Sequence, residues 1–267
     1  MTGFSADWLS LREPADAAAR DTTLTARLGA LTRERARSRF IDLGCGTGAN
    51  LRYLAPRIGG LQEWLLVDRD ESLLARVGEI PGCTIHTRCV DLTSGLESFA
   101  LDGDVVVTAS ALLDLVSDRW LTHLISRCHE SRAAALFALS YDGRITCEPV
   151  DADDEWIRQL VNLHQRGDKG FGPALGPKAA ERACELFSGF GYEVHSALSD
   201  WHLQPRDSEL QRALIEEWAT AAAELAGGES DRCLAWRQRR LNHVARGASR
   251  ITVGHLDVLA LPGSFAG

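Results

Sequence analysis

Short apolar runs alternate with stretches of helical periodicity through the first half of the chain. The runs at residues 39–43, 63–68, 83–88, 104–108 and 133–140 predict strands, and the stretches at 15–37, 49–57, 71–78 and 117–130 predict helices. Repeated strand–helix units indicate a parallel sheet with helices on both faces, because a parallel crossover needs about the length of a helix. The pattern therefore predicts an α/β fold.

The second half of the chain departs from this alternation. An acidic helix start near residue 151 is followed by a Gly/Pro-rich loop, a helix at 177–190, a strand at 191–198, helices at about 207–226 and 229–246, and a last strand at 250–260. No linker or repeat divides the chain, so we expect one domain over residues 1–267. Within it we expect an N-terminal helical segment (1–37), a ligand-binding core (38–145) and two insertions (146–176 and 203–248).

Composition narrows the class of protein. With 45% hydrophobic and 25% charged residues, the chain of 267 residues has an ordinary globular composition. No apolar run reaches the ~20 residues that span a bilayer, and the N-terminal sequence has no secretory signal. The seven cysteines are odd in number and contain no C-x-x-C pair, which argues against a disulfide framework and a zinc site. We expect a cytoplasmic protein without a membrane partner or a bound metal.

The charge balance argues against nucleic acid as a partner. The net charge is -8, and the only lysines are Lys169 and Lys178. Proteins that bind nucleic acid normally carry a concentrated basic surface, because neutralised phosphates supply most of the non-specific affinity. The densest basic cluster, at 33–39, ends a predicted helix, where cations suit the helix dipole.

The segment Asp42-Leu-Gly44-Cys-Gly46-Thr-Gly48 carries the strongest chemical signal. Glycines between a strand and a helix let the backbone turn sharply and approach a ligand, and the helix N-terminus offers free N–H groups. Asp68 ends the second strand, twenty residues beyond Gly48, where a carboxylate can accept hydrogen bonds from ribose hydroxyls. The segment thus predicts a nucleoside-binding loop.

Two kinds of nucleoside-binding enzyme share this arrangement. Gly44, Gly46 and Ala49 formally satisfy the G-x-G-x-x-A pattern of nicotinamide dehydrogenases. Three features are not explained by the dehydrogenase pattern and favour a second kind of nucleoside-binding enzyme, described next. Asp42 stands two residues before the first glycine, a long helical segment precedes the first strand, and Asp91 follows the third strand.

With these residues in place, the sequence resembles the class I S-adenosylmethionine-dependent methyltransferases, well over residues 38–145 and in general plan elsewhere. The resemblance implies a Rossmann-like, doubly wound, mostly parallel sheet whose last strand is antiparallel, and S-adenosylmethionine as cofactor. It implies that Asp42 holds the methionine portion, Asp68 the ribose, and Asp91 with Leu92 the adenine. The complete predicted cofactor set is Asp42, Gly44, Cys45, Gly46, Gly48, Asn50, Asp68, Arg69, Asp91, Leu92 and Ser110.

The acceptor is harder to predict than the cofactor. The segment 108–116 lacks the Asn/Asp-Pro-Pro-Tyr/Phe motif of enzymes that methylate base amines, so we expect a small-molecule acceptor, methylated at oxygen or nitrogen. The residue that removes a proton is not identified; the candidates are His164, Tyr141 and Asp114. The Gly-rich loop after residue 161 is expected to cover the pocket, with His164, Arg166 or Lys169 touching an acidic or polar acceptor, and Trp8 and Arg12 to cover the cofactor.

Several alternatives remain open at this stage. One is an NAD(P)-dependent oxidoreductase, and another is a non-catalytic member of the methyltransferase fold that still binds the cofactor. Aminopropyl transfer from a decarboxylated cofactor is a third. The insertion at 203–248 is expected to shape the acceptor pocket or to form a homodimer contact. Its tryptophans, Trp218 and Trp236, with Trp201 just before them, are expected in the core.

Overall fold

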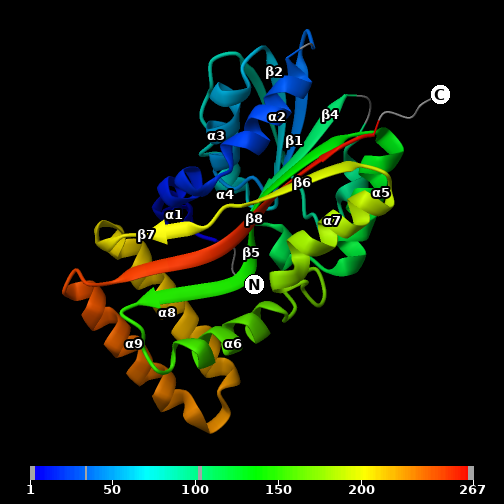
Figure 1. The fold of residues 1–267 in the computed structure, drawn as a ribbon. Helices are drawn as coiled ribbons and strands as arrows, with labels where there is room; N and C mark the ends of the chain where they lie inside the picture. The colour runs from blue at the N-terminus through cyan, green and yellow to red at the C-terminus, as the bar shows by residue number, and fades with distance from the viewer. Residues whose placement is uncertain (1–3, 34, 102–103, 264–267) are drawn as a thin grey trace.

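The computed structural model describes residues 4–33, 35–101 and 104–263, which contain one sheet of eight strands (Figure 1). The strands are β1 (Ser38–Leu43), β2 (Gln62–Asp68), β3 (Cys83–Cys89), β4 (Val105–Ser110), β5 (Ala134–Glu148), β6 (Glu193–Leu198), β7 (Trp201–Leu203) and β8 (Arg250–Leu261). Their order is β3-β2-β1-β4-β5-β8-β6, with β7 paired to β8. Strands β1 to β5 pair in parallel and β8 is antiparallel to its neighbours, so the predicted fold class is confirmed.

Helices cover both faces of this sheet, because successive strand residues point to opposite sides. The helices are α1 (Ala6–Ala19), α2 (Thr22–Thr32), α3 (Ala49–Ile58), α4 (Glu71–Leu74), α5 (Asp118–Ser131), α6 (Asp154–Gln165), α7 (Ala179–Gly189), α8 (Ser208–Leu225) and α9 (Ser230–Ala245). Phe40 of β1 belongs to a hydrophobic cluster with residues of α2 and α3, whereas its neighbour Ile41 belongs to a cluster with residues of α5 and α7. Figure 1 shows α2 and α3 on the other side of the sheet from α5 and α7.

The helix predicted at residues 15–37 is wrong, because the chain forms two helices there. Helix α1 ends at Ala19, and Arg20 has an extended backbone conformation with ψ of 137°. Asp21 then caps α2, its side chain accepting a hydrogen bond from the Leu24 N–H at 2.7 Å. Arg20 is buried beside α3 and β8, so a tertiary contact fixes this break.

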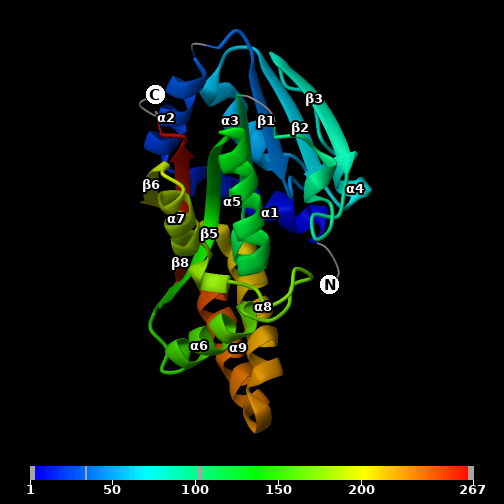
Figure 2. The same cartoon turned by 90° about the vertical axis from the view of Figure 1, so that its right-hand side faces the viewer.

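Strands β5 and β8 are longer than the other strands of the sheet. Their extended ends lie against a helical unit made of α6, α8 and α9 (Figure 2). Strand β5 continues to Glu148, so the insertion predicted from residue 146 begins later than expected, and the short strand β7 was not predicted. Trp201, Trp218 and Trp236 are buried together in the core of this unit, which confirms their predicted place. Among the residues described above, no helix is long and apolar enough to cross a membrane.

Candidate functional site

The glycine loop joins the end of β1 to the start of α3. Gly44, Gly46 and Gly48 have φ values of 63°, 54° and 82°, in the left-handed region that favours glycine. A Cβ on Gly46 would lie 2.8 Å from Leu9 of α1, and one on Gly44 would lie 3.3 Å from a Leu112 methyl group. The loop therefore needs glycine both for its conformation and for its close neighbours.

Asp42 lies beneath this loop and is fully buried. Its Oδ1 accepts hydrogen bonds from Asn50 Nδ2 at 2.6 Å and from the Thr108 hydroxyl at 2.7 Å, whereas its Oδ2 has no hydrogen-bond partner. Burial raises the pKa of Asp42 to about 6, against the lowering effect of these two hydrogen bonds. One oxygen of a buried carboxyl is thus left to accept a further hydrogen bond.

Two more carboxylates stand at the ends of the next strands. Asp68 accepts hydrogen bonds from the Gly46 N–H at 2.8 Å and the Asp70 N–H at 3.0 Å, which fix it against the glycine loop. Asp91, after β3, is exposed, and a hydrogen bond from the Thr93 N–H helps to lower its pKa. Parallel strands in neighbouring positions bring both acids to the same edge of the sheet.

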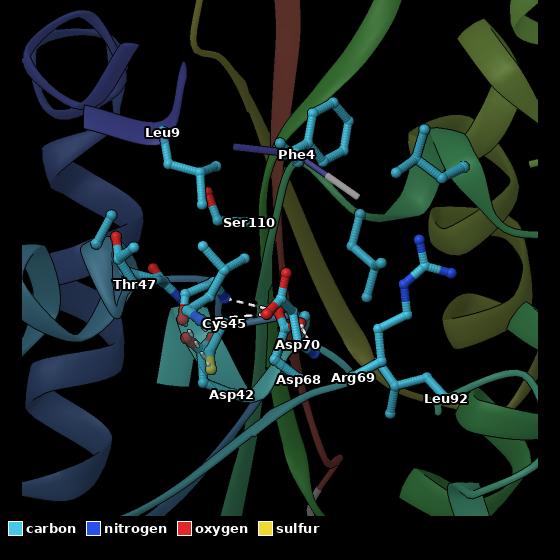
Figure 3. A pocket seen from close by; sticks show the side chains of 18 of the residues that line it. Phe4, Leu9, Asp42, Cys45, Thr47, Asp68, Arg69, Asp70, Leu92 and Ser110 are labelled. Atoms are coloured by element: carbon cyan, nitrogen blue, oxygen red, sulfur yellow. Dashed lines mark hydrogen bonds between the residues drawn. The ribbon is translucent and has the colours of Figure 1, made fainter. Parts of the chain in front are cut away.

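These residues line one cavity of about 1200 Å³, a volume that includes space open to solvent (Figure 3). Its walls contain every residue of the predicted cofactor set except Gly48. Figure 3 shows Phe4 and Leu9 across the cavity from Asp42 and Asp68. The chain segment around α1 also contributes Arg12 and Asp16 to the lining, whereas Trp8 packs against the core of the helical unit; the prediction that Arg12 covers the cofactor stays a prediction.

The three predicted proton acceptors lie outside this lining. The Tyr141 hydroxyl donates a hydrogen bond to Asn162 Oδ1 at 2.7 Å, and burial raises the pKa of Tyr141. His164 lies between Lys169 Nζ, 3.3 Å from its Nδ1, and Glu224, 3.1 Å from its Nε2. Asp114 is buried, and desolvation raises its pKa to about 6.

The Gly-rich loop does reach the cavity, through Lys169 and Phe171 rather than through His164 or Arg166. Phe171 packs edge-on against Trp120 with ring centroids 5.3 Å apart, which anchors the loop to α5. The ammonium of Lys169 and the guanidinium of Arg12 both lower the pKa of Asp114 by their charge, against the larger effect of burial. Two cations from distant parts of the chain, Arg12 and Lys169, therefore line the same cavity and favour the charged form of this buried acid.

Sequence reasoning missed several lining residues. Leu9 and Asp16 come from α1, and Thr47, Asp70 and Thr93 are neighbours of predicted residues. The last three could have been found from their position beside the motif acids. Leu9 and Asp16 gave no local signal, because only the packing of α1 against the loop brings them there. Among the described residues, no group of His, Cys, Asp and Glu side chains is arranged to hold a metal ion.

Comparisons with known proteins agree with this geometry. Residues 40–133 match the family model described as a methyltransferase domain. The cyclopropane synthase MmaA2 from Mycobacterium tuberculosis is similar in structure, with a TM-score of 0.50, 13% identity and coverage of 96% of this chain and 94% of that one. So is the YcgJ protein from Bacillus subtilis, with a TM-score of 0.52, 13% identity and coverage of 91% and 100%.

A protein from Anaeromyxobacter dehalogenans, named as a candidate type II methyltransferase, is similar at a TM-score of 0.52, with 17% identity and coverage of 91% of this chain and 97% of that one. No curated protein matches the sequence. At these identities the solved structures establish the fold, and the family model covers the segment that contains the glycine loop and all three strand-end acids. Residues 40–133 thus match the methyltransferase domain model, within a fold that the chain shares with these solved structures.

Proposed function

We propose that the protein transfers a methyl group from S-adenosylmethionine to an oxygen or nitrogen atom of a small-molecule acceptor. The observation that carries this proposal is the single cavity whose one wall is formed by the glycine loop and the strand-end acids and whose other wall includes Arg12, Lys169 and Phe171. The proposed cofactor site is thus continuous with a space that is lined by cationic and aromatic side chains.

The residues present fit the cofactor. The unpartnered Oδ2 of Asp42 is a buried acceptor suited to the ammonium of an amino acid, and the helix N-terminus of α3 follows the loop. Asp68 is held in position by two backbone N–H groups and suits ribose hydroxyls, while the apolar side chains of Leu73, Val90 and Leu92 suit a purine ring. When bound, the cofactor supplies an electrophilic methyl group on a sulfonium.

The chain's own contribution to the reaction is alignment and the exclusion of water. Leu112, Leu115 and Phe171 form an apolar part of the wall after β4 and in the Gly-rich loop. Since positive charge disappears as a methyl group leaves a sulfonium, a dry pocket that orients the acceptor supplies much of the catalysis. Leu9 of α1 lies against Gly46 and closes the opposite side.

Lys169 and Arg12 set the character of the acceptor in this proposal. Arg12 is held by a bidentate pair with Asp16, at 2.9 and 3.1 Å, whereas Lys169 contacts His164 through its Nζ. A half-buried lysine in a ligand cavity suits a carboxylate or another polar group on the acceptor. Asp114 is not part of the cavity lining, so we give it no direct contact with the acceptor.

The test supplies purified protein with S-adenosylmethionine labelled in its methyl group and a cell extract separated into small-molecule, protein and nucleic-acid fractions. We expect label to appear in the small-molecule fraction in a product that chromatography separates from the labelled donor. The matched control is an Asp68→Ala variant, which should form much less labelled product. Labelled product confined to protein or nucleic acid would contradict the small-molecule acceptor while leaving methyl transfer in place, and no labelled product in any fraction would contradict both.

A further inference from the structure

Lys169 reaches the cavity from the Gly-rich loop that follows α6, and two sets of contacts hold this loop in place. Asp168 Oδ1 accepts hydrogen bonds from the backbone N–H groups of Gly170 at 2.7 Å and Gly172 at 3.0 Å. Phe171, which also lines the cavity, packs against α5. The backbone around Lys169 is therefore fixed, and the position of the ammonium depends on the lysine side chain itself.

The Lys169 ammonium is held by a chain of contacts that ends in the helical unit. Its Nζ lies 3.3 Å from Nδ1 of His164 in α6, and His164 Nε2 lies 3.1 Å from Oε2 of Glu224 in α8. Because an ammonium can only donate, Nδ1 accepts its hydrogen bond, and the imidazole proton on Nε2 is then donated to Glu224. A lysine has a long flexible stem, so holding its ammonium in one place costs conformational entropy unless such contacts fix it. His164 and Glu224, which do not line the cavity, thus fix a group that does.

Arg12 of α1 is a second cation in the same lining, and it is fixed in a comparable way. Its Nε and Nη2 pair with both carboxylate oxygens of Asp16, and Trp201 Nε1 donates a hydrogen bond to Asp16 Oδ1 at 3.1 Å. The guanidinium carbon lies 5.1 Å from the centroid of the Trp201 ring. The pair with Asp16 does not use Nη1 of Arg12, and His164 accepts from one of the three ammonium protons of Lys169. Both cations therefore keep donors for a ligand.

The acids of the cavity leave the charge of Lys169 available to a ligand. Five acids line the cavity, and four of them stand at the glycine loop and the strand ends: Asp42, Asp68, Asp70 and Asp91. The fifth, Asp16, is paired with Arg12. Desolvation raises the pKa of Asp114 and of Glu217, both outside the lining, and the charges of the two cations oppose that rise. Among the described residues, Lys169 makes its hydrogen bond to an imidazole rather than to a carboxylate.

We propose that the end of the cavity lined by Arg12, Lys169 and Phe171 is an anion-binding subsite, in which the two cations hold a carboxylate or phosphate group of the acceptor. His164 and Glu224 are positioning residues of this subsite, because they act through Lys169. The inference rests on the proposed function and deepens it, because it names the substrate class of the same reaction. It also gives the helical unit a part in acceptor binding, since α6 and α8 supply the residues that hold the lysine.

The experiment observes the two lysines of the protein by NMR after labelling with ¹³C-lysine, and Lys178→Met assigns their signals. With S-adenosylhomocysteine present, the probes are sodium acetate and sodium phosphate at constant pH, and sodium chloride at equal ionic strength is the control. We expect acetate or phosphate to shift the ε-carbon signal of Lys169 and to leave that of the exposed Lys178 in place. The probe that binds more tightly distinguishes a carboxylate from a phosphate.

Methyl transfer is measured separately, so two kinds of failure are distinguishable. Labelled small-molecule product without a response of Lys169 to either anion would overturn the inference and leave the proposed function standing. A response of Lys169 without any labelled product would overturn the proposed function, and with it the assignment of the anion to an acceptor.

Variants test the positioning role of His164. His164→Leu removes the acceptor of the Lys169 hydrogen bond, whereas His164→Asn places an amide oxygen near the position of Nδ1. We expect His164→Leu to weaken anion binding at Lys169 by about 3- to 10-fold, and His164→Asn to restore most of the affinity. The matched control is His195→Leu: His195 is 25% exposed against 29% for His164, also pairs with a glutamate, and does not line the cavity. Unchanged anion affinity in His164→Leu, or an equal loss in His195→Leu, would overturn the positioning role.

Discussion

The cofactor half and the helical unit of this protein use polar residues in different ways. Around the glycine loop, the polar groups stand at strand ends, and several atoms, such as Asp42 Oδ2, remain without a partner. In the unit of α6, α8 and α9, most of the charge is paired across the chain, although Gln211 Oε1 and Arg237 Nε also lack a partner: Arg240, which is fully buried, pairs with Asp154, and Arg239 pairs with Asp151. The first arrangement leaves room for a ligand, and the second holds helices together.

The largest expected effect concerns the stability of the helical unit. Arg240→Met leaves Asp154 without its buried partner and should lower the free energy of unfolding by about 3–5 kcal/mol. Chemical denaturation measures the change. Arg239→Gln, which removes a partly exposed arginine from the neighbouring pair, should cost about 1 kcal/mol or less. If Arg240→Met also weakened S-adenosylhomocysteine binding in folded protein, the separation of the two regions would be wrong.

The next effect concerns the cofactor half. Asp68→Ala removes the proposed ribose ligand and the acceptor for the Gly46 N–H, and should weaken S-adenosylhomocysteine binding by about 100-fold, because two charge-assisted hydrogen bonds are lost. Calorimetry measures the dissociation constant. Asp70→Asn is the matched control: Asp70 lines the same cavity and caps α4, and asparagine can keep the cap. Comparable losses in both variants would argue against a specific role for Asp68.

A pH dependence should follow from Asp42. Its pKa of about 6 means that the carboxyl loses its charge as the pH falls through that value, and a neutral carboxyl attracts the cofactor's ammonium less. Affinity for S-adenosylhomocysteine should therefore fall by about tenfold between about pH 8 and about pH 5, since about one Asp42 in ten stays ionised at the lower value. Arg20 and Asp68 are the other charged groups that act on Asp42.

Two variants check the source of this dependence. Asp42→Asn should bind more weakly at neutral pH and show a flat profile. Asp114→Asn should keep the profile of the unaltered protein, although the pKa of Asp114 is also raised to about 6, because Asp114 does not line the cofactor cavity. If the profile flattened only in Asp114→Asn, the pH dependence would come from Asp114, and our assignment to Asp42 would be wrong.

The last expected effect, similar in size to the pH effect, lies at the acceptor end, where the two regions meet. Lys169→Met should lower kcat/KM for the acceptor by about tenfold and leave the dissociation constant of S-adenosylhomocysteine unchanged, because the ammonium faces the acceptor in our proposal. Lys178→Met, at the only other lysine, is the matched control: Lys178 is exposed and outside the cavity lining, and its replacement should change neither constant. If Lys169→Met lost affinity for S-adenosylhomocysteine and Lys178→Met did not, Lys169 would contact the cofactor rather than the acceptor.

The same comparison explains how much could be predicted from the sequence. The loop from Gly44 to Gly48 and the acids Asp42, Asp68 and Asp91 follow from local spacing, because parallel strands carry their ends to one edge of the sheet. Leu9 and Arg20 could not be found this way. Their positions depend on how α1 and the residue that follows it pack against residues 30 or more positions away. The break between α1 and α2, which the sequence pattern did not predict, is part of that packing.

The acceptor end shows the same limit. His164 was a reasonable choice from residue type, but the structure turns it towards Glu224 and places Lys169 in the cavity. The choice between two neighbours in one Gly-rich loop depends on contacts with α8, which no local pattern records. Sequence thus predicted the elements that line the cavity and the loop that reaches it, but named Lys169 only as one of three candidate side chains in that loop.

We expect the cavity bounded by the glycine loop, Asp68 and Asp91 to bind an S-adenosyl nucleoside. Titration calorimetry of the unaltered protein with S-adenosylhomocysteine and, separately, with NADH tests it most directly. We expect one-to-one binding of S-adenosylhomocysteine and no heat with NADH. Binding of NADH without binding of S-adenosylhomocysteine by folded protein would contradict it.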